Sequence, residues 1–175
     1  MNMLDEGTAK RSALEISDEL DRLGASLTTG AALDTCRVSL SALGEKLDPS
    51  LALLAEVVLS PAFPQADLDR LKKQQLAGIQ REKVTPNTIG LRLMPALLYG
   101  AGHPYGAPFT GSGNEASVAA LTRDQLVAFH RSWFKPNNAT LIVVGATSLA
   151  EIQPKLEGLF AGWKAGEVPK KSISV

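Results

Sequence analysis

The sequence has only one cysteine and no excess of charge of either sign. A single cysteine, Cys36, cannot form an internal disulfide or a cysteine-rich metal site. Lys and Arg together number 18, as do Asp and Glu, so nothing favours binding to a nucleic-acid backbone. No apolar run is long enough to cross a bilayer, and the first residues, MNMLDEGTAKR, lack the basic and then apolar order of a secretory signal. These absences argue against nucleic-acid binding and against a membrane-spanning role.

The sequence does contain enough apolar material for one folded domain. Hydrophobic residues make up 45% and charged residues 21% of the 175 positions, which is typical of a globular chain with a sizeable core. We predict a single domain over residues 1–165. Residues 166–175 are expected to form a linker, in which Ser172 to Val175 are a candidate opening of a further strand.

Capping signals and apolar spacing predict the helices. Ser12 and Glu15 form a capping box at the start of one helix, and Gly24 suits the left-handed residue that ends it. A second capping box begins at Thr122. Pro95 predicts a kink or an early break in its helix. Further helices are expected to begin near Asp48-Pro49, Phe63, Thr85-Pro86 and Ser148.

Three short segments are predicted to be strands. Ser26–Ala31 and Thr35–Ala42 indicate an antiparallel hairpin with one wet face, and Cys36 falls on its inward side as a core residue. Ala139–Gly145 (ATLIVVG) is apolar at nearly every position, as expected for a central strand covered on both faces. Many helices beside a small antiparallel or mixed sheet indicate an α+β fold. So small a sheet suggests that strands preceding Met1 belong to the intact domain.

Four segments spread over nearly the whole chain carry a family signature. They are LDEGTAKRSALEISDELDRLGASL, LSPAFPQADLDRLKKQQLAGIQREK, YGAGHPYGAPFTGS and LTRDQLVAFHRSWFKPNNATLIVVG. In this order they resemble one repeat domain of the pitrilysin/insulinase family of zinc metallopeptidases, which includes the mitochondrial processing peptidase subunits. The likeness is greatest to the first domain of the second, non-catalytic half of long bacterial members. It implies a LuxS/mitochondrial-processing-peptidase-like sheet covered by helices, within a clamshell that encloses peptides.

The same resemblance indicates which metal-binding residues are absent. Active members carry H-x-x-E-H on one helix and a further glutamate on a later helix. Histidines with that spacing share a helix face and bind one zinc ion, whose water the motif glutamate activates. The resemblance places the second histidine at Asn2 and the later glutamate at Gly78. We therefore expect no catalytic residue and no zinc in this domain, and zinc only in a companion active domain.

Four residues are candidates for contact with a peptide or with a companion domain. His103 and Tyr105 lie in the Gly- and Pro-rich stretch Gly100–Gly113, which predicts a long loop. They could touch a substrate, or they could simply fix the loop by packing and hydrogen bonds. Phe109 and Trp163 could mark an interdomain contact.

Other polar groups have simpler interpretations. His130 is expected to be a packing residue of its helix, and Asp5 and Glu6 are expected to lie in a solvated turn. The hairpin Ser26–Ala42 is a candidate edge for capture of a peptide as an added strand. The alternative is that further strands cover this edge.

These observations lead to one main hypothesis and two alternatives. The main hypothesis is a non-catalytic domain that packs with an active domain or a partner subunit to form a peptide-enclosing proteolytic chamber. The resemblance to bacterial members favours the periplasm. One alternative is a structural assembly protein like the core subunits of the bc1 complex. The other is an active zinc endopeptidase with atypical ligands such as Asp5, Glu6 or His103. Exposed sheet edges would also allow self-association.

Overall fold

The structure, a computed structural model, describes residues 1–170, so the strand predicted to begin at Ser172 lies outside the described residues. The elements in order are α1 (Ala13–Leu23), β1 (Ser26–Ala31), β2 (Cys36–Ser41), α2 (Leu47–Leu59), α3 (Gln65–Glu82), α4 (Pro86–Tyr99), α5 (Glu115–Ala120), α6 (Arg123–Trp133) and α7 (Leu149–Phe160). Short 3-10 turns lie at Gly44–Lys46, Pro104–Gly106 and Pro136–Asn138. The α+β class is confirmed. In the part described, no helix is both long and apolar enough to cross a membrane.

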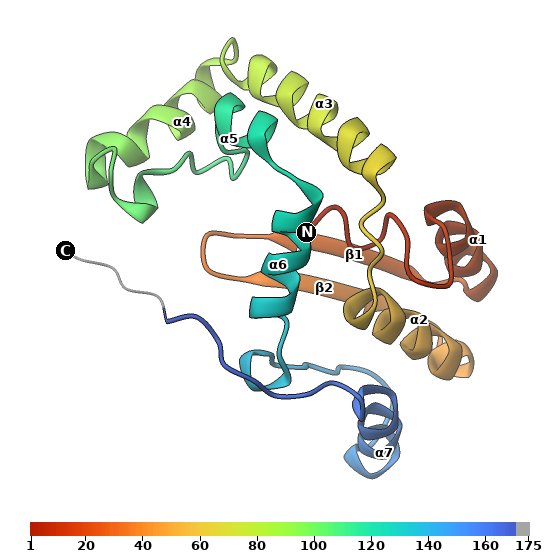
Figure 1. Ribbon diagram of the computed structural model, residues 1–175. Coiled ribbons are helices and arrows are strands. Elements are labelled where there is room, and N and C mark those ends of the chain that lie inside the picture. Colours follow the sequence, from red (N-terminus) through yellow and green to blue (C-terminus); the bar gives the residue numbers. More distant parts are fainter. Residues whose placement is uncertain (171–175) are drawn as a thin grey trace.

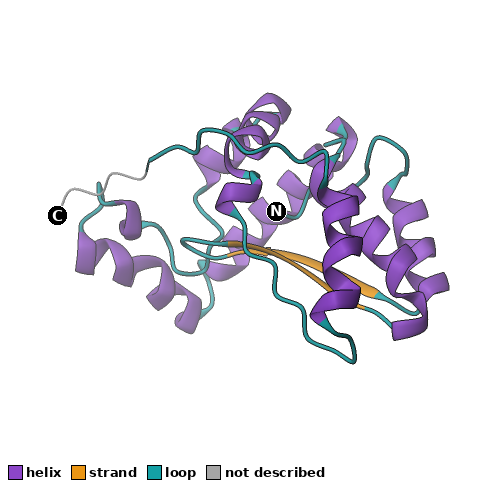
Figure 2. Cartoon of the chain, turned by 90° about the horizontal axis from the view of Figure 1, so that it is seen from below, coloured by secondary structure: helices purple, strands orange, loops and turns teal. Residues whose placement is uncertain are grey.

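A β-hairpin lies at the middle of the molecule with the helices around it. In Figure 1, α1 and α2 lie on the right, at the end of the strands opposite the hairpin turn, and α3, α4 and α5 form an arch above the strands. The helix α7 lies below, beside α2. Figure 2 shows the two strands nearly edge-on among the helices. The arch and the hairpin are therefore separate parts of the fold, joined by the segments that precede α3 and follow α5.

The predicted helix ends are largely confirmed. The Ser12 hydroxyl accepts a hydrogen bond from the Glu15 amide, and the Glu15 carboxylate accepts one from the Ser12 amide at 2.8 Å. Gly24 ends α1 in the left-handed conformation with φ 59°. Asp48 was expected as the cap of the next helix, with Pro49 at its first position, but a 3-10 turn runs directly into α2, whose first residue is Leu47. Asp48 therefore lies in the first turn and is not the cap.

The hairpin has the predicted two-faced character. In its antiparallel register Leu27 lies opposite Leu40, and Thr29 lies opposite Val38. Leu27 and Val38 pack against both groups of buried side chains, while the residues on the other face of β2 are exposed. One face therefore carries the core contacts and the other faces solvent.

The prediction that Cys36 is a core residue is wrong, because its side chain is exposed. It lies on the same face as Val38 and Leu40 but at the tip of the hairpin, where it pairs with Ala31. Figure 1 shows that this tip extends away from α1 and α2. The predicted alternation of inward and outward residues in β2 is correct, but no helix covers the tip of the hairpin.

The segment Ala139–Gly145 does not form the predicted central strand. It forms no strand in the structure, and its four large apolar residues are exposed: Leu141 (52%), Ile142 (78%), Val143 (43%) and Val144 (92%). The physical reason is that within residues 1–170 the only sheet is the hairpin, and this segment is not one of its strands.

Of the two outcomes predicted for Pro95, a kink or an early break, the structure shows no break. The helix α4 continues to Tyr99, and Pro95 is buried within it. Proline has no amide hydrogen, so it cannot donate to the carbonyl of Leu91 four residues earlier. The Phe109 amide donates to that carbonyl oxygen instead, at 3.0 Å. The missing helical hydrogen bond is thus replaced by one that fixes the loop after α4.

Two apolar clusters meet on α2. The larger joins the N-terminal segment with α1, α2 and the start of α3, and the smaller joins α2 with α7. The buried members of the first are Met3, Leu4, Ile16, Leu53, Val57, Phe63 and Leu68. Those of the second are Leu51, Leu54 and Ile152. The buried residues of α3 are Leu68 and Ile79, which lie three turns apart on one face of the helix.

Candidate functional site

Gly78, which the family resemblance predicts at the position of the later zinc ligand, lies inside α3 and has no side-chain donor atom. It is two turns after Leu71, which packs against the first cluster, so both residues lie on the inner face of the helix. A Cβ atom at Gly78 would come no closer than 3.9 Å to another group, the Arg81 guanidinium. The backbone therefore leaves room for a side chain there, and the sequence does not supply one.

The N-terminal segment packs beside the first half of α3 through apolar groups. Met3 and Leu4 are buried, and Met1 packs against the same cluster as Leu71. Asn2 is exposed. Glu6 forms an ion pair with Arg70 of α3. The contacts that hold this segment on α3 therefore use packing and a surface charge pair.

The residues present do not fit a zinc ion. In the part of the chain that the structure describes, no group of three or more His, Cys, Asp or Glu side chains could hold a metal. Asp5 accepts a hydrogen bond from Thr29, Glu6 pairs with Arg70, and His103 lies in the loop after α4, so the structure does not bring these three together. An active enzyme using them as atypical ligands has no support in this geometry.

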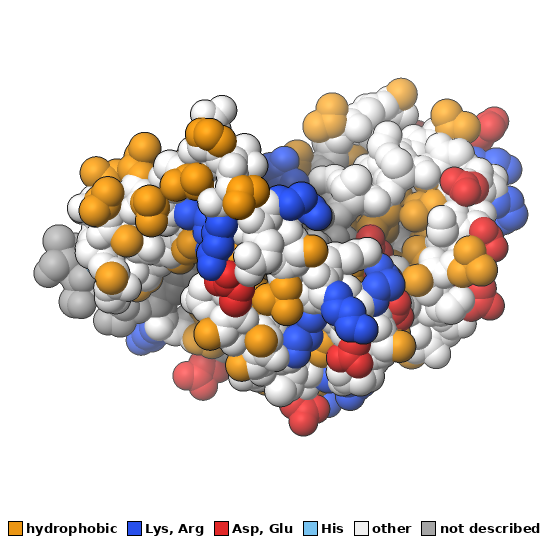
Figure 3. All heavy atoms as spheres, turned by 90° about the horizontal axis from the view of Figure 1, so that it is seen from above, with side chains coloured by type: hydrophobic (Ala, Val, Ile, Leu, Met, Phe, Trp, Pro, Cys, Tyr) orange, Lys and Arg blue, Asp and Glu red, His pale blue; other side chains and the backbone are white. Residues whose placement is uncertain are grey.

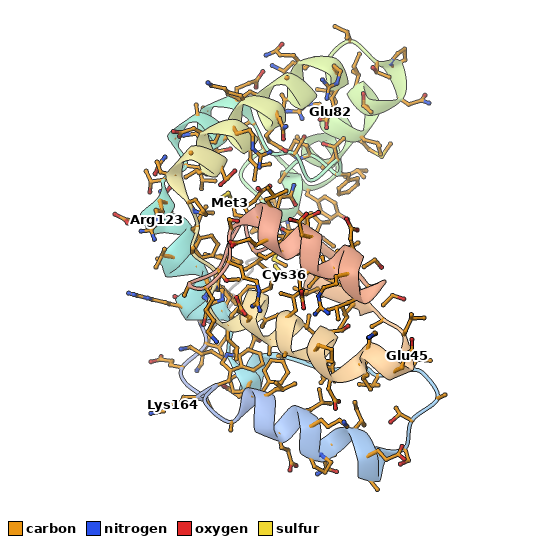
Figure 4. All side chains as sticks on the ribbon, turned by 90° about the vertical axis from the view of Figure 1, so that its right-hand side faces the viewer. Met3, Cys36, Glu45, Glu82, Arg123 and Lys164 are labelled. Carbon is orange, nitrogen blue, oxygen red and sulfur yellow. The ribbon has the colours of Figure 1, made fainter. Side chains whose placement is uncertain are left out.

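A polar network holds the far end of α3 against α4 and the following loop. Arg92 donates to the Glu82 carboxylate and to the Ser112 hydroxyl, each at 2.7 Å, and to the Gly113 carbonyl oxygen at 2.9 Å. The Ser112 hydroxyl also lies 2.7 Å from Glu82, and the side chain of Arg92 is 10% exposed. Glu82 lies between α3 and α4 in Figure 4, well away from Met3. This network fixes the loop that carries the predicted contact residues.

The hydrogen bonds also set the charge of Glu82. Burial raises the pKa of this carboxyl, but hydrogen bonds from Ser112, Arg92 and Thr110 outweigh burial, and the pKa lies below its ordinary value. Glu82 is therefore ionised at neutral pH and forms a charge-assisted pair with Arg92.

Three of the predicted contact residues form one aromatic cluster with Tyr99 at the end of α4. The Tyr99 ring stacks on His103 with centroids 5.5 Å apart and meets Tyr105 and Phe109 edge-on. His103 Nδ1 accepts a hydrogen bond from the Tyr105 amide at 3.1 Å. The Tyr105 hydroxyl lies 3.1 Å from both carboxylate oxygens of Asp34 in the hairpin turn, and that hydrogen bond and charge raise the pKa of Tyr105. The cluster thus joins the loop to the tip of the hairpin.

The cluster continues into an apolar face on α4, which comprises Leu93, Met94, Leu97, Leu98 and Tyr99. These side chains are 47% to 84% exposed. Arg92 is the only charged residue of α4, and its charge is turned inward to Glu82. Figure 3 shows hydrophobic side chains gathered on the side where Figure 1 places α4. This face was not predicted from the sequence, although a single arginine in an apolar helix could have indicated that its charge has an internal partner.

Trp163 and His130 lie apart from this surface. The Trp163 indole donates to the Phe134 carbonyl oxygen at 3.0 Å, and its ring packs on Phe160. His130 Nε2 is 2.8 Å from the Val58 carbonyl oxygen, and its ring contacts Phe63 and Phe134. The histidine is the packing residue that its helix position predicts. Trp163 is held by its own chain and is half-buried.

Comparisons with known families agree with this scaffold. A family model described as Insulinase (Peptidase family M16) matches residues 1–99, and one described as Peptidase M16 inactive domain matches residues 120–174. A solved peptidase M16 inactive domain from Pseudomonas fluorescens is 32% identical with a TM-score of 0.89, and the match covers 99% of this chain and 42% of that one. The fold and these two matches define an inactive domain of a zinc-protease class. The chain belongs to peptidase family M16.

Curated relatives are considerably longer than this chain. An uncharacterized zinc protease of Mycobacterium bovis is 28% identical over 144 residues, which cover 82% of this chain and 32% of the relative. An uncharacterized zinc protease of Rickettsia felis is 22% identical over 166 residues, which cover 95% of this chain and 40% of the relative. The chain therefore spans about a third to two fifths of these relatives.

Proposed function

We propose that this domain packs against an active M16 domain, in the same polypeptide or in a partner subunit, and helps to enclose peptide substrates while the other domain cleaves them. The observation that carries the proposal is the preserved M16 scaffold without a metal ligand at Gly78. Zinc would be held by the companion. Residues 1–165 would form the domain that packs against the companion. Near its end, Trp163 is held by the hydrogen bond to Phe134.

The surface that supports this role is the apolar face of α4 with the aromatic cluster beside it. Water does not favour a contiguous apolar face, and such faces mark contacts with other proteins or ligands. Aromatic residues and methionine are enriched in interfaces, and this surface contains Tyr99, Phe109 and Met94. His103 and Tyr105 stand at its border, next to the hairpin. A companion domain would cover α4, and the border residues would face the enclosed peptide.

The first test concerns the chemistry of the chain by itself. Purified protein should contain no stoichiometric zinc by elemental analysis and should not cleave a mixed peptide library. Stoichiometric, tightly bound zinc together with cleavage that a chelator abolishes would contradict the proposal.

The second test concerns the companion. An M16 protein that carries H-x-x-E-H, taken from the same source, should form a complex with this chain, detected by analytical gel filtration. Leu97→Lys should weaken the complex, because it places a charge on the α4 face at a residue that is 84% exposed. Lys10→Glu, at an exposed residue outside α4, is the matched control. A complex without any peptide cleavage would instead favour the structural assembly role.

A further inference from the structure

The first part of the loop after α4 is closed on itself and held at the end of that helix. The His103 amide donates to the Gly100 carbonyl oxygen at 3.2 Å, and the Gly106 amide donates to the His103 carbonyl oxygen at 2.8 Å. His103 Nδ1 accepts from the Tyr105 amide, and the Tyr99 ring stacks on the imidazole. These contacts join this part of the loop to the last turn of α4, so we expect it to move with that helix.

The second part of the loop is fixed between α3 and α4. The Phe109 amide donates to the Leu91 carbonyl oxygen at 3.0 Å, and the side-chain amide of Gln75 in α3 donates to the Ser112 carbonyl oxygen at 3.0 Å. Arg92 of α4 adds its bond to the Ser112 hydroxyl at 2.7 Å. Because both helices bind the loop, the end of α3, α4 and the loop form one body. We call this body, residues 75–113, the outer arch.

The outer arch meets the hairpin at one polar contact. At the base of the arch, Leu68 and Leu71 are the residues that α3 contributes to the first apolar cluster. At the far end, the Tyr105 hydroxyl lies 3.1 Å from both carboxylate oxygens of Asp34, in the turn between β1 and β2. Among the hydrogen bonds and ion pairs within residues 1–170, this contact is the one that joins the outer arch to the hairpin. In Figure 1 the loop after α4 descends toward that turn.

We propose that the contact between Tyr105 and Asp34 is a latch, and that the outer arch moves away from the tip of the hairpin when the latch opens. A hydroxyl that donates to a carboxylate makes a charge-assisted bond, which favours the closed position. Asp34 is exposed and Tyr105 is half-buried, so water can replace each partner when the bond breaks. An opening of the latch therefore leaves no buried polar group without a partner.

The latch would determine where the apolar face of α4 stands relative to the hairpin, because α4 is part of the outer arch. A fixed position of that face would lower the entropic cost of covering it, whichever protein does so. The proposal is independent of the chamber role, since it rests on contacts within this chain.

The test is a distance measurement between spin labels by double electron–electron resonance. One label is attached to Cys36, which is the single cysteine and is exposed at the tip of the hairpin. The other is attached to Gly102→Cys in the loop, where an added Cβ would meet no neighbour within 4 Å. The 175-residue chain with both labels should give one main distance. Tyr105→Phe should raise the population at longer distances about fivefold, because one net hydrogen bond is lost.

Asp34→Ala removes the other partner of the same bond and should have the same effect as Tyr105→Phe. The two changes together should do no more than either one alone, because a bond that is already lost cannot be lost again. Equal effects from opposite ends of the contact would separate the latch from a local change in the loop or in the hairpin turn.

Tyr99→Phe is the matched control. It removes the same group from a neighbouring ring of the aromatic cluster, and the Tyr99 hydroxyl makes no hydrogen bond in the described part of the chain. It should leave the distances unchanged, and circular dichroism should show that every variant remains folded. The proposal is overturned if Tyr105→Phe and Asp34→Ala leave the distances unchanged, or if their effects add. It is equally overturned if Tyr99→Phe lengthens the distances as much as Tyr105→Phe.

Discussion

Two glycines differ in backbone conformation, so that alanine should have opposite effects on stability at the two positions. Gly78 lies inside α3, and an added Cβ would meet no close neighbour. Gly24 ends α1 with φ 59°, a conformation that L side chains rarely adopt. We predict that Gly78→Ala raises the free energy of unfolding by about 0.5–1 kcal/mol, because alanine favours the helix. Gly24→Ala should lower it by about 1 kcal/mol or more. Urea titrations of both variants test the pair, and a destabilised Gly78→Ala would show that the inner face of α3 is less open than described.

His130 should make the protein sensitive to mild acid. Burial lowers the pKa of its imidazole below the ordinary 6.5, the charge of Lys135 lowers it further, and the bond to the Val58 carbonyl oxygen partly opposes these effects. The unfolded chain therefore binds the proton at a higher pH than the folded chain does. Stability is fully present above pH 6.5 and is lost as the pH falls from there toward the folded pKa.

The measurement for His130 is urea unfolding at several pH values between 7.5 and 5.5. The wild-type protein should lose stability over this range, and His130→Gln should show a flatter profile, because glutamine can keep a hydrogen bond to Val58 without titrating. Equal slopes for the two proteins would contradict the assignment of this effect to His130.

At the scale of elements, the contact of α3 with α4 depends on the pair formed by Arg92 and Glu82. We predict that Arg92→Met lowers the free energy of unfolding by roughly 2–3 kcal/mol, because it leaves Glu82 and the Gly113 carbonyl without their donor. The double variant Arg92→Met with Glu82→Leu should be less destabilised than Arg92→Met alone, since no buried charge remains. A double-mutant cycle with chemical denaturation gives both values. Strictly additive losses would mean that the pair does not act as a unit.

The same pair makes the stability of the contact between α3 and α4 depend on pH. The pKa of Glu82 is lower in the folded protein than in the unfolded chain, so the pair stabilises the fold above pH 4.5. That contribution is lost as the pH falls through the folded pKa. The difference in stability between the wild type and Glu82→Gln should therefore shrink between pH 6 and pH 3. A constant difference over that range would indicate that the charge of Glu82 contributes little.

For the whole molecule, the sequence predicts what is decided locally and misses what is decided by distant neighbours. The capping boxes at Ser12 and Thr122 depend on residues three positions apart, and both form. Ala139–Gly145 has the composition of a strand, but pairing needs a second edge that local sequence does not specify. Cys36 lies on the predicted face of its strand, but whether it is buried depends on whether a helix covers the tip of the hairpin. For the candidate site, the assignment of Gly78 to the ligand position stays a prediction from the motif. The apolar face of α4 could not be predicted without knowing that Arg92 turns inward.

The division of the interior into two clusters predicts that α7 can open without the rest of the molecule. Apart from the loops, α7 packs mainly on α2, where Ile152 is buried against Leu51 and Leu54. Ile152→Ala should lower the free energy of opening α7 by about 2–3 kcal/mol, because it removes the centre of the smaller cluster. Hydrogen exchange should then quicken in α7 and much less in α1.

Ile16→Ala is the matched control for this division. It alters a residue of the first cluster that is buried to the same extent, so it should quicken exchange in both α1 and α7 by destabilising the whole fold. If Ile152→Ala changes exchange in α1 and α7 equally, the two clusters unfold as one unit. In that case α2 transmits the loss of stability from one cluster to the other, and the molecule unfolds as a single cooperative unit.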